Sequence, residues 1–264
     1  VRLREEVDCG SYVRRLIDYA SEPGGRVPAY LLIPKGQGPF TAVLCLHPTD
    51  DVVGHGVVVG LGGKVNRAYA SELAERGFVT LAPAYPHLAQ YRPDWAALGY
   101  VSGTMKAIWD NVRGLDVLED MEEVRAGGVG AIGHSLGGHN AIYTATFDAR
   151  IAVVVSSCGF DSYQAYKDGD ITSWTSSCYM PRLRDYALAA IPFDFHDMVA
   201  ALAPRPFFAS APLRDDNFKW QSVDVVAAAA RRVYALYGVE DRLSIAHPDC
   251  AHDFPLTMRE RAYE

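Results

Sequence analysis

The sequence predicts an α/β protein with a single domain, in which a mainly parallel sheet carries helices on both faces. Three observations lead to this fold class. Apolar runs of strand length alternate with runs that have the period of a helix. The strand runs are continuously apolar, which is typical of strands covered on both faces. The 264 residues suit one or two domains, at about 100–200 residues each, and no biased segment divides them.

An antiparallel hairpin is expected at the start of the chain. Residues 12–19 and 27–33 are two strand-like runs, and the tetrapeptide EPGG at residues 22–25 supplies the proline and glycines of a tight turn. This hairpin would add antiparallel strands at one edge of a sheet that is otherwise parallel.

The first buried strand and the first helix follow the hairpin. Residues 40–46, FTAVLCL, form an apolar run that suits a strand covered on both faces, and we expect Cys45 to be a small core residue. A helical pattern over residues 67–76 ends at Gly77, because glycine favours the left-handed cap of a helix. A second buried run occupies residues 78–82.

The same alternation continues to the end of the chain. Alternating strands and helices imply parallel strands that are joined by crossover helices on both faces of the sheet. The further expected strands are residues 129–133, 151–155, 207–211 and 243–246. The further expected helices are residues 103–121, 136–147, 223–237 and 255–263.

One stretch, residues 159–203, breaks this rhythm. It is rich in aromatic residues and contains no clear strand. A connection of this length inside a compact domain is usually functional. We therefore expect a small cap inserted over the carboxyl edge of the sheet, within one domain that spans residues 1–264. The alternative is a second helical layer that has no role in binding.

The composition excludes several classes of protein. Lys and Arg total 25 against 32 Asp and Glu, so the formal net charge is −7 and a nucleic-acid partner is not expected. The five cysteines have no C-x-x-C spacing, which argues against a disulfide framework or a zinc site. No apolar stretch reaches the roughly 18 residues of a membrane span. We expect a cytoplasmic protein. Because the chain opens with Val1 rather than Met, the alternative that a leader peptide has been removed is left open.

The sharpest local motif is GHSLGG at residues 133–138, which fits G-x-S-x-G. A predicted strand precedes it and a predicted helix follows it, which is the context that this motif requires. Small residues on both sides of Ser135 permit a strained reversal from strand to helix. The hydroxyl would then project from the sheet edge, beside the positive end of the helix.

A serine hydroxyl is a weak nucleophile, so it needs a base and an acid that orients the base. In a fold of this class the chain order is serine, acid, histidine. The acid would be Asp215 or Asp216, just past the strand at residues 207–211. His252, in the loop after the final strand, is the expected base, and His247 is the second choice.

The oxyanion that develops during such a reaction needs at least two N–H donors. The amide of Leu136, the residue after the nucleophile, is one. The second is assigned to the amide of Thr49, because Pro48 has no N–H. We expect His47 to shape this loop rather than to act as a base, and the adjacent carboxylates at 50–51 are weak evidence for a cation site.

At this point the sequence resembles the α/β-hydrolase superfamily, in particular its dienelactone-hydrolase-like and acetyl-xylan-esterase-like branch. The resemblance extends from about residue 12 to the end of the chain. The matching pieces are VPAYLLIP at 27–34, AVLCLH at 42–47, LAERGFV at 73–79, GHSLGG at 133–138, DDNF at 215–218 and CAHDF at 250–254. It implies an α/β-hydrolase fold and a Ser-Asp-His triad, and it says little about the substrate.

Two departures from the family pattern matter. Dienelactone hydrolases use a cysteine nucleophile, so Ser135 argues against a dienelactone substrate. The oxyanion loop usually reads His-Gly, and here Pro48, which has no N–H, follows the histidine. The acid also depends on the relative chosen: prolyl-oligopeptidase-like proteins favour Asp215, and acetyl-xylan-esterase-like proteins favour Asp216. We choose Asp215.

The predicted activity is hydrolysis of a small-molecule carboxylic ester through an acyl-enzyme, with no metal or organic cofactor. Ser135 attacks, His252 transfers the proton and Asp215 orients the imidazole. Two alternatives are a serine peptidase of the prolyl-oligopeptidase kind and a binding protein that has lost catalysis. The aromatic residues expected near the substrate are Trp95, Tyr100, Trp174, Tyr179 and Trp220.

Overall fold

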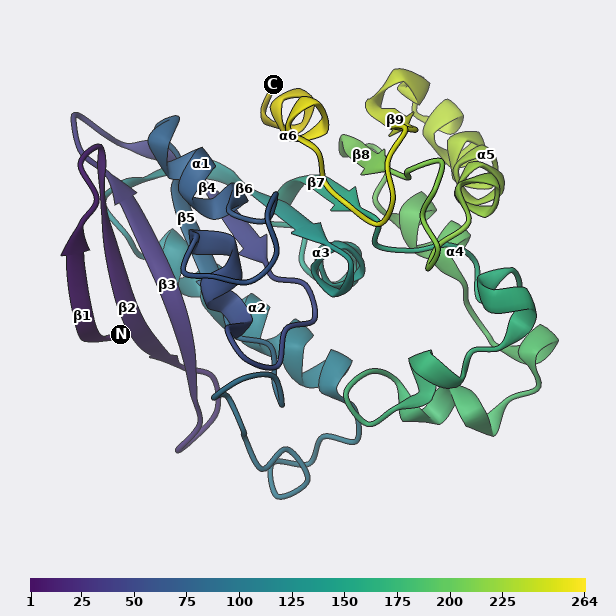
Figure 1. The fold of residues 1–264 in the computed structure, drawn as a ribbon, viewed down its shortest axis with the longest axis horizontal. Coiled ribbons are helices and arrows are strands. Elements are labelled where there is room, and N and C mark those ends of the chain that lie inside the picture. The colour runs from purple at the N-terminus through teal and green to yellow at the C-terminus, as the bar shows by residue number, and fades with distance from the viewer.

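The computed structural model describes all residues from 1 to 264, and its nine strands form one sheet. The strands are β1 (Arg2–Asp8), β2 (Tyr12–Ala20), β3 (Arg26–Pro34), β4 (Phe40–Leu46), β5 (Val79–Pro83), β6 (Val124–His134), β7 (Ile151–Ser157), β8 (Phe207–Ser210) and β9 (Leu243–Ala246). Their order across the sheet is β1-β2-β3-β5-β4-β6-β7-β8-β9. Figure 1 shows β1 to β3 on one side of the molecule and β8 and β9 toward the other.

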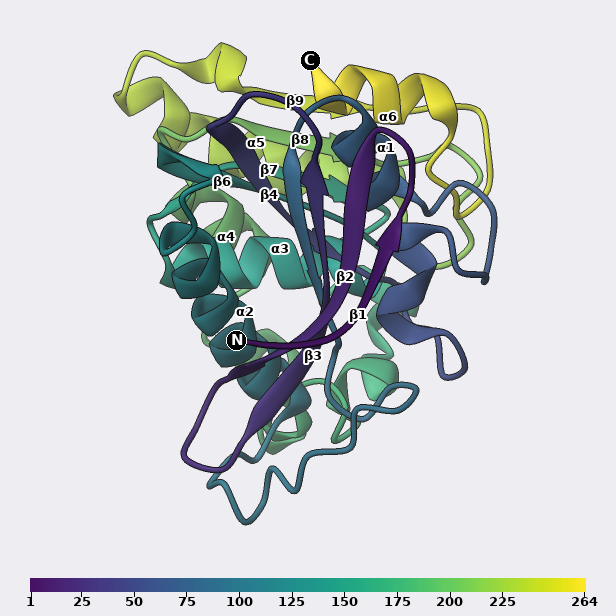
Figure 2. The same cartoon turned by 90° about the vertical axis from the view of Figure 1, so that its left-hand side faces the viewer.

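The direction of the strands divides the sheet into two parts. From β5 to β9 every neighbouring pair is parallel, whereas β1, β2 and β3 run antiparallel to their neighbours, and β3 joins β5 in an antiparallel pair. Figure 2 looks onto the edge that β1, β2 and β3 form. The predicted α/β-hydrolase arrangement, a mainly parallel sheet with an N-terminal antiparallel hairpin, is confirmed.

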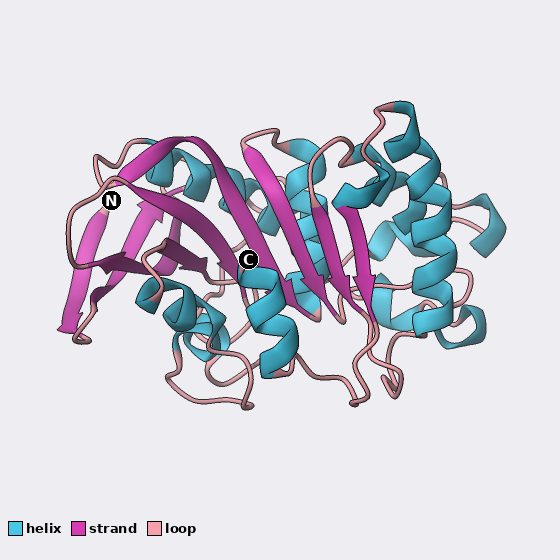
Figure 3. Ribbon diagram, turned by 90° about the horizontal axis from the view of Figure 1, so that it is seen from above, coloured by secondary structure: helices cyan, strands magenta, loops and turns pink.

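Helices cover both faces of the sheet, as Figure 3 shows. The α-helices are α1 (Tyr69–Glu75), α2 (Gly103–Glu119), α3 (Leu136–Phe147), α4 (Phe195–Ala201), α5 (Trp220–Leu236) and α6 (Leu256–Tyr263). The larger apolar core lies between the sheet and α2 to α5, and a smaller one lies under α1 and α6 on the opposite face. Cys45 is fully buried in the smaller core, as expected.

Two elements do not follow from the sequence patterns used above. Strand β1 has the sequence RLREEVD and is almost entirely exposed, so no apolar run marks it. Charged side chains on an edge strand discourage pairing with other molecules, and they also conceal the strand from a search for apolar runs. Helix α4 has only seven residues, too few for its periodicity to stand out.

Residues 159–203, which we call the cap segment, contain no strand. Besides α4 they form short 3₁₀ helices, which are η2 (Tyr166–Gly169), η3 (Thr172–Thr175), η4 (Pro181–Asp185) and η5 (Leu188–Ala190). In Figure 1 most of this segment is the green chain at the lower right. Tyr163, Trp174 and Phe195 join the larger core, so the segment packs directly on the domain. No helix of the protein is long and apolar enough to cross a bilayer.

Candidate active site

Ser135 occupies the turn between β6 and α3, with a backbone φ of 54°. Non-glycine residues rarely adopt such an angle, which costs about 1–3 kcal/mol and persists only where the surroundings impose it. Here the Ser135 N–H donates a hydrogen bond to the Ser157 carbonyl at 2.8 Å, which ties the turn to β7. The strained reversal expected from the motif is therefore present, at the carboxyl end of β6.

The glycines of the motif allow the turn to pack against its neighbours. A Cβ atom at Gly133 would overlap the backbone of Gly137, and one at Gly137 would overlap the carbonyl of Leu46. A Cβ at Gly138 would lie 2.8 Å from the Cα of Gly159, at the start of the cap segment. Each small residue therefore meets the backbone of another element, and none can be enlarged without moving that element.

Asp215 and His252 come together from two different loops. The His252 Nδ1 lies 2.9 Å from each carboxylate oxygen of Asp215. The backbone N–H groups of Asn217 and Phe218 also donate to Asp215 Oδ1, at 2.8 and 3.1 Å. Burial acts to raise the pKa of Asp215, but these hydrogen bonds and the neighbouring imidazole outweigh it and hold the pKa below its usual value.

The alternatives that the sequence left open occupy other places. Asp216 is exposed, whereas the side chain of Asp215 is 1% exposed. Both ring nitrogens of His247 have partners, since Nδ1 lies 2.7 Å from the Ala211 carbonyl and Nε2 lies 3.0 Å from Asp224. Asp215 and His252 are thus the pair that the structure brings together.

Ser135 and His252 line the same cavity, of about 240 Å³, which we call the polar cavity. Its residues are Pro48, Thr49, Asp50, Val57, Lys64, Arg67, His134, Ser135 and His252. The ring of His134 packs edge-on against that of His252, with centroids 4.9 Å apart. Ser135 and His252 therefore line one cavity, and Asp215 bonds to His252, although the three residues lie far apart in the sequence.

A partly buried ion pair supports the histidine loop, and the sequence patterns did not predict it. Arg67 is 3% exposed, and its guanidinium pairs with the carboxylate of Asp253 and donates to the His252 carbonyl at 3.2 Å. Asn66 donates to the same carboxylate at 2.7 Å. Arg67 and Asp253 stand 186 positions apart along the chain, so only the folded structure pairs them.

The loop after β4 contains the other expected donor. Thr49 lines the polar cavity, and its hydroxyl lies 3.0 Å from that of Tyr179. His47 shapes this loop, because its Nδ1 donates to the Pro48 carbonyl at 2.7 Å and its Nε2 accepts from the Tyr85 N–H at 2.9 Å. Burial lowers the pKa of His47 to about 4, so the ring stays neutral and cannot serve as a cation at neutral pH.

Asp50, in the same loop, has a structural contact of its own. Its Oδ1 accepts hydrogen bonds from the backbone N–H groups of Val52, Val53 and Gly54, at 3.0, 2.6 and 3.3 Å. The carboxylate thus caps the turn that leads into η1 (Gly54–Val59). This role accounts for the acidic residue without a bound cation.

Ser135 also lines a second, smaller cavity of about 60 Å³, which we call the aromatic cavity. Its residues are Ser135, Leu136, His139, Tyr166, Ser173, Trp174, Tyr179, Asn217 and Phe218. Two of the predicted aromatic residues, Trp174 and Tyr179, belong to it. His139 and Phe218 were not singled out by sequence reasoning, although His139 follows the motif directly.

The other three predicted aromatic residues line neither cavity. Trp95 stacks on His87 with ring centroids 3.6 Å apart, and Trp220 packs against His247 at 5.1 Å. Tyr100 lies beside the ammonium group of Lys106, 5.7 Å from its ring centroid. Their places correct the expectation that all five surround the substrate, since an aromatic residue packs as readily in a core as in a binding site.

The sequence profile described as "Glucuronyl esterase, fungi" matches residues 99–238, a little over half of the chain. The chain belongs to this family. The match includes the turn at Ser135, the cap segment and the acid loop at Asp215. The protein is a carboxylic ester hydrolase with an α/β-hydrolase fold, and the expected serine-esterase branch of that superfamily is confirmed.

The chain is also similar to individual proteins. The chain is 25% identical to "Putative hydrolase YtaP" of Bacillus subtilis, over 90% of the chain and 81% of that protein. It is 23% identical to 2,6-dihydropseudooxynicotine hydrolase of Paenarthrobacter nicotinovorans, over 84% of the chain but only 50% of that protein. The structure of a glucuronoyl esterase from Solibacter usitatus superimposes with a TM-score of 0.75 at 18% identity, over 99% of the chain and 83% of that chain.

A metal ion would find few free ligands in this esterase. Cys158, Asp215 and His252 place one ligand atom each within 4.8 Å of one another. However, Asp215 and His252 Nδ1 already bond to each other, and the Cys158 thiol lies 3.3 Å from the Asp253 carbonyl. Burial also raises the pKa of Cys158 well above its usual value, which keeps the thiol protonated.

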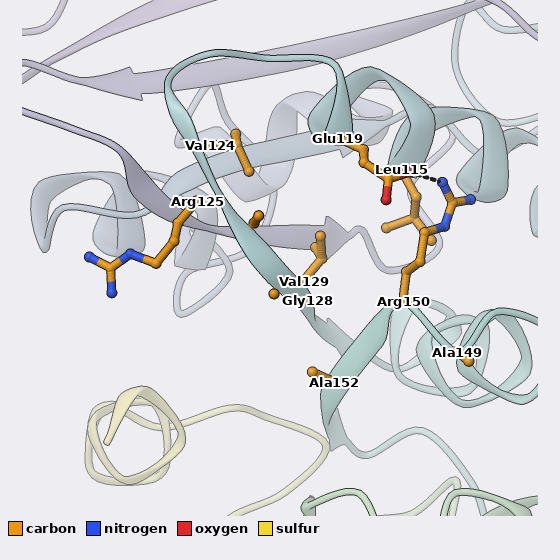
Figure 4. A pocket seen from close by; sticks show the side chains of 11 residues that line it. Leu115, Glu119, Val124, Arg125, Gly128, Val129, Ala149, Arg150 and Ala152 are labelled. Atoms are coloured by element: carbon orange, nitrogen blue, oxygen red, sulfur yellow. Dashed lines mark hydrogen bonds and ion pairs between the residues drawn. The ribbon is translucent and has the colours of Figure 1, made fainter.

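A separate hollow of about 360 Å³ lies at the amino ends of β6 and β7, whereas Ser135 lies at the carboxyl end of β6 (Figure 4). Its wall includes Arg125, Gly128, Val129 and Arg150. The guanidinium of Arg150 is occupied by Asp116, Glu119 and Asp148. None of the predicted catalytic residues lines this hollow, which therefore plays no part in the candidate active site.

Proposed function

We propose that this esterase cleaves a small-molecule carboxylic ester through Ser135, His252 and Asp215. Ser135 attacks the acyl carbon, and His252 Nε2 accepts the hydroxyl proton. The His252–Asp215 hydrogen bond is the observation that carries the proposal, because it fixes the proton on Nδ1 and leaves Nε2 free to act as the base. His252 then returns the proton to the departing alcohol, and a water molecule releases the acyl group.

The oxyanion of the tetrahedral intermediate would be held by the amides of Leu136 and Thr49. Leu136 is the first residue of α3, so its N–H has no acceptor within the helix. Thr49 lines the polar cavity and Leu136 lines the aromatic cavity, and Ser135 lines both. The backbone N–H of Thr49 makes no hydrogen bond within the protein. Two amide donors held by a helix and by the His47-braced loop need no reorganisation as charge develops.

The two cavities would separate the two halves of the ester. The alcohol must leave toward the group that protonates it, and His252 lines the polar cavity but not the aromatic cavity. We therefore assign the leaving alcohol to the polar cavity and the acyl group to the aromatic cavity. The cap segment supplies Tyr166, Trp174 and Tyr179 to the acyl side, in line with a role in specificity.

A labelling experiment tests the nucleophile. A fluorophosphonate should modify the wild-type protein at Ser135 alone, as peptide mass mapping would show. Ser135→Ala should remain unlabelled and lose on the order of 10⁴–10⁶ in kcat on a p-nitrophenyl ester. Ser177→Ala, which removes an exposed serine of the cap segment, is the matched control and should behave as wild type. Activity that survives Ser135→Ala would refute the mechanism.

The cytoplasmic location expected from the sequence remains a proposal. It can be tested by fractionating the source cells and following the esterase with an antibody, and recovery from the culture medium would contradict it.

A further inference from the structure

The side-chain amide of Asn217, a residue that lines the aromatic cavity, is only half satisfied. Its Oδ1 accepts a hydrogen bond from the Tyr166 hydroxyl at 3.1 Å, which fixes the orientation of the amide. Its Nδ2 carries two N–H donors, makes no hydrogen bond within the protein and is not sealed from solvent. A molecule that enters the cavity can therefore reach this donor.

Contacts on two sides hold this amide in place. The backbone N–H of Asn217 donates to Asp215 Oδ1 at 2.8 Å, so the residue is anchored in the loop of the proposed acid. Tyr166, which binds the amide oxygen, is 3% exposed, and its ring packs against those of Trp174 and Phe218 with centroids 5.7 and 5.6 Å apart. A donor that is already held in one orientation loses little conformational entropy when it binds a ligand.

The other polar side chains of the cavity wall are engaged, sealed or loosely held. The Tyr179 hydroxyl already bonds to the loop after β4, and the ring nitrogens His139 Nε2 and Trp174 Nε1 are sealed from solvent. Ser173 is exposed, so the cavity opens to solvent there and a larger acyl group can extend outward. The side chains of Asn217 and Ser173 thus supply the open donors, and only that of Asn217 is held by a hydrogen bond.

We propose that Asn217 selects esters whose acyl group carries an oxygen on its α- or β-carbon, by donating a hydrogen bond from Nδ2 to that oxygen. This inference rests on the proposed function, which places the acyl group in the aromatic cavity. Ser135 and Asn217 line the same cavity, so the donor faces the part of the acyl group next to the reacting carbon. An ether or hydroxyl oxygen accepts this bond, whereas a methylene group displaces water from Nδ2 and leaves the amide unpaired.

Isosteric esters test the proposal directly. Ethyl methoxyacetate and ethyl butanoate differ by an ether oxygen in place of a methylene group, and ethyl 3-methoxypropanoate and ethyl pentanoate form the same pair one carbon further out. Release of acid is followed in a pH-stat, and rates are divided by the uncatalysed hydroxide rates to remove inductive effects. Wild type should prefer the ether in at least one pair by about three- to tenfold in kcat/KM, as one neutral hydrogen bond would give.

Three variants assign the preference to Asn217. Asn217→Asp keeps the oxygen that accepts from Tyr166 but has no N–H donor, and should lower the ether-to-alkyl ratio to about one or below. Asn217→Leu should do the same without an added charge. Tyr166→Phe frees the amide to rotate and should lower the ratio by about two- to threefold. Tyr186→Phe, which alters an exposed tyrosine of the cap segment, is the matched control and should leave the ratio unchanged, and thermal unfolding checks that every variant folds.

The outcomes separate this inference from the proposed function. A wild-type ratio near one in both pairs, or a high ratio that both Asn217 variants leave intact, would overturn the role of Asn217. A ratio that falls in Ser173→Ala instead would also overturn it, because the exposed hydroxyl would then be the donor. If no ester of either pair is hydrolysed while the fluorophosphonate still labels Ser135, the acyl class is wrong and the nucleophile stands. If Ser135→Ala hydrolyses the ethers as well as wild type does, the proposed function itself fails.

Discussion

The turn at Ser135 and the cap segment meet at the aromatic cavity, but they are built in opposite ways. The turn consists of glycines packed against backbone, and its atoms are fixed by β7 and by the loop after β4. The cap segment consists of short 3₁₀ turns, the short helix α4 and large aromatic side chains, and two of its buried polar side-chain atoms, Asp161 Oδ1 and Trp174 Nε1, lack a partner. The glycines of the turn cannot be enlarged without moving a neighbouring backbone. The side chains of the cap segment can be replaced by others.

This difference teaches where chemistry and specificity reside in the molecule. If Ser135, Asp215 and His252 react as proposed, they must hold their geometry closely, and they stand on a strained turn and on loops that follow strand ends. The side chains that would face the acyl group need only fill space and supply hydrogen bonds, which residues on a connecting segment can do. We call the turn at Ser135, the strand ends and the loops that carry Asp215 and His252 the framework. Substitutions in the framework should abolish activity or folding, and substitutions in the cap segment should alter selectivity.

The largest expected effect tests the framework through the acid. Asp215→Asn should lower kcat on a p-nitrophenyl ester by on the order of 10⁴, because an amide cannot hold the imidazole in the same tautomer or stabilise its cation. Asp216→Asn changes an exposed neighbour in the same loop and should alter kcat by less than about threefold. Steady-state kinetics of both variants would decide the matter, and equal losses would show that Asp215 is not the orienting acid.

The sequence predicted the framework well because steric rules determine it locally. The motif around Ser135 is recognisable because a strand, a turn of small residues and a helix follow one another within a few residues. The candidate acid and base were then placed by their order in the chain and by their positions after predicted strands. The sequence could not distinguish Asp215 from Asp216, because the choice between adjacent residues depends on how their loop folds. That loop is set by the amides of Asn217 and Phe218, which bond the Asp215 carboxylate.

The cap segment and the supporting contacts could not be predicted, for a different reason. Trp95 and Trp174 have the same chemistry, and only the path of the chain places one on His87 and the other beside Ser135. The Arg67–Asp253 pair joins residues that no local pattern links. Strand β1 escaped notice because its exposed residues are charged.

The next effect concerns the stability of the framework. Gly133→Ala would place a methyl group into the Gly137 backbone, and we expect it to destabilise the fold by more than about 3 kcal/mol. Gly130→Ala, in the same strand, meets only side-chain atoms of Val43 and Val153 at 3.4–3.6 Å and should cost about 1 kcal/mol or less. Urea unfolding measures both. Similar costs for the two variants would mean that the turn is looser than its packing implies.

A smaller effect tests the cap segment through pH. Burial raises the pKa of Asp161 to about 7, with Asp194 and Asp215 nearby, although the Lys219 N–H donates to its Oδ2 at 2.9 Å. The folded state thus keeps a proton that the unfolded chain loses near pH 4, so this residue's contribution to stability falls as pH rises from about 4 to 7. Asp161→Asn should therefore gain stability relative to wild type over that range, by on the order of 2 kcal/mol.

Thermal and urea unfolding at pH 4.5 and pH 8 would measure the gain. Asp185→Asn removes an exposed carboxylate of the same segment and should show no such gain. If the difference in unfolding free energy between Asp161→Asn and wild type is the same at pH 4.5 and at pH 8, the Asp161 carboxyl is already ionised in the folded protein at pH 4.5.

The smallest effect probes the one hydrogen bond that joins the cap segment to the proposed oxyanion loop. The hydroxyl groups of Tyr179 and Thr49 lie 3.0 Å apart, and the bond is exposed. Tyr179→Phe and Thr49→Val each remove it while leaving the ring and the Thr49 amide in place. Each should lower kcat/KM by about three- to tenfold, because one net hydrogen bond contributes about 0.5–1.5 kcal/mol.

The double variant decides whether the two regions cooperate. If the bond positions the Thr49 amide, the double variant should lose no more than either single variant, which gives a coupling energy of about 1 kcal/mol. If the two losses simply multiply, the hydroxyl groups act independently. The cap segment would then influence the reaction only through the walls of the aromatic cavity, and the division between a catalytic framework and a selective insertion would be complete.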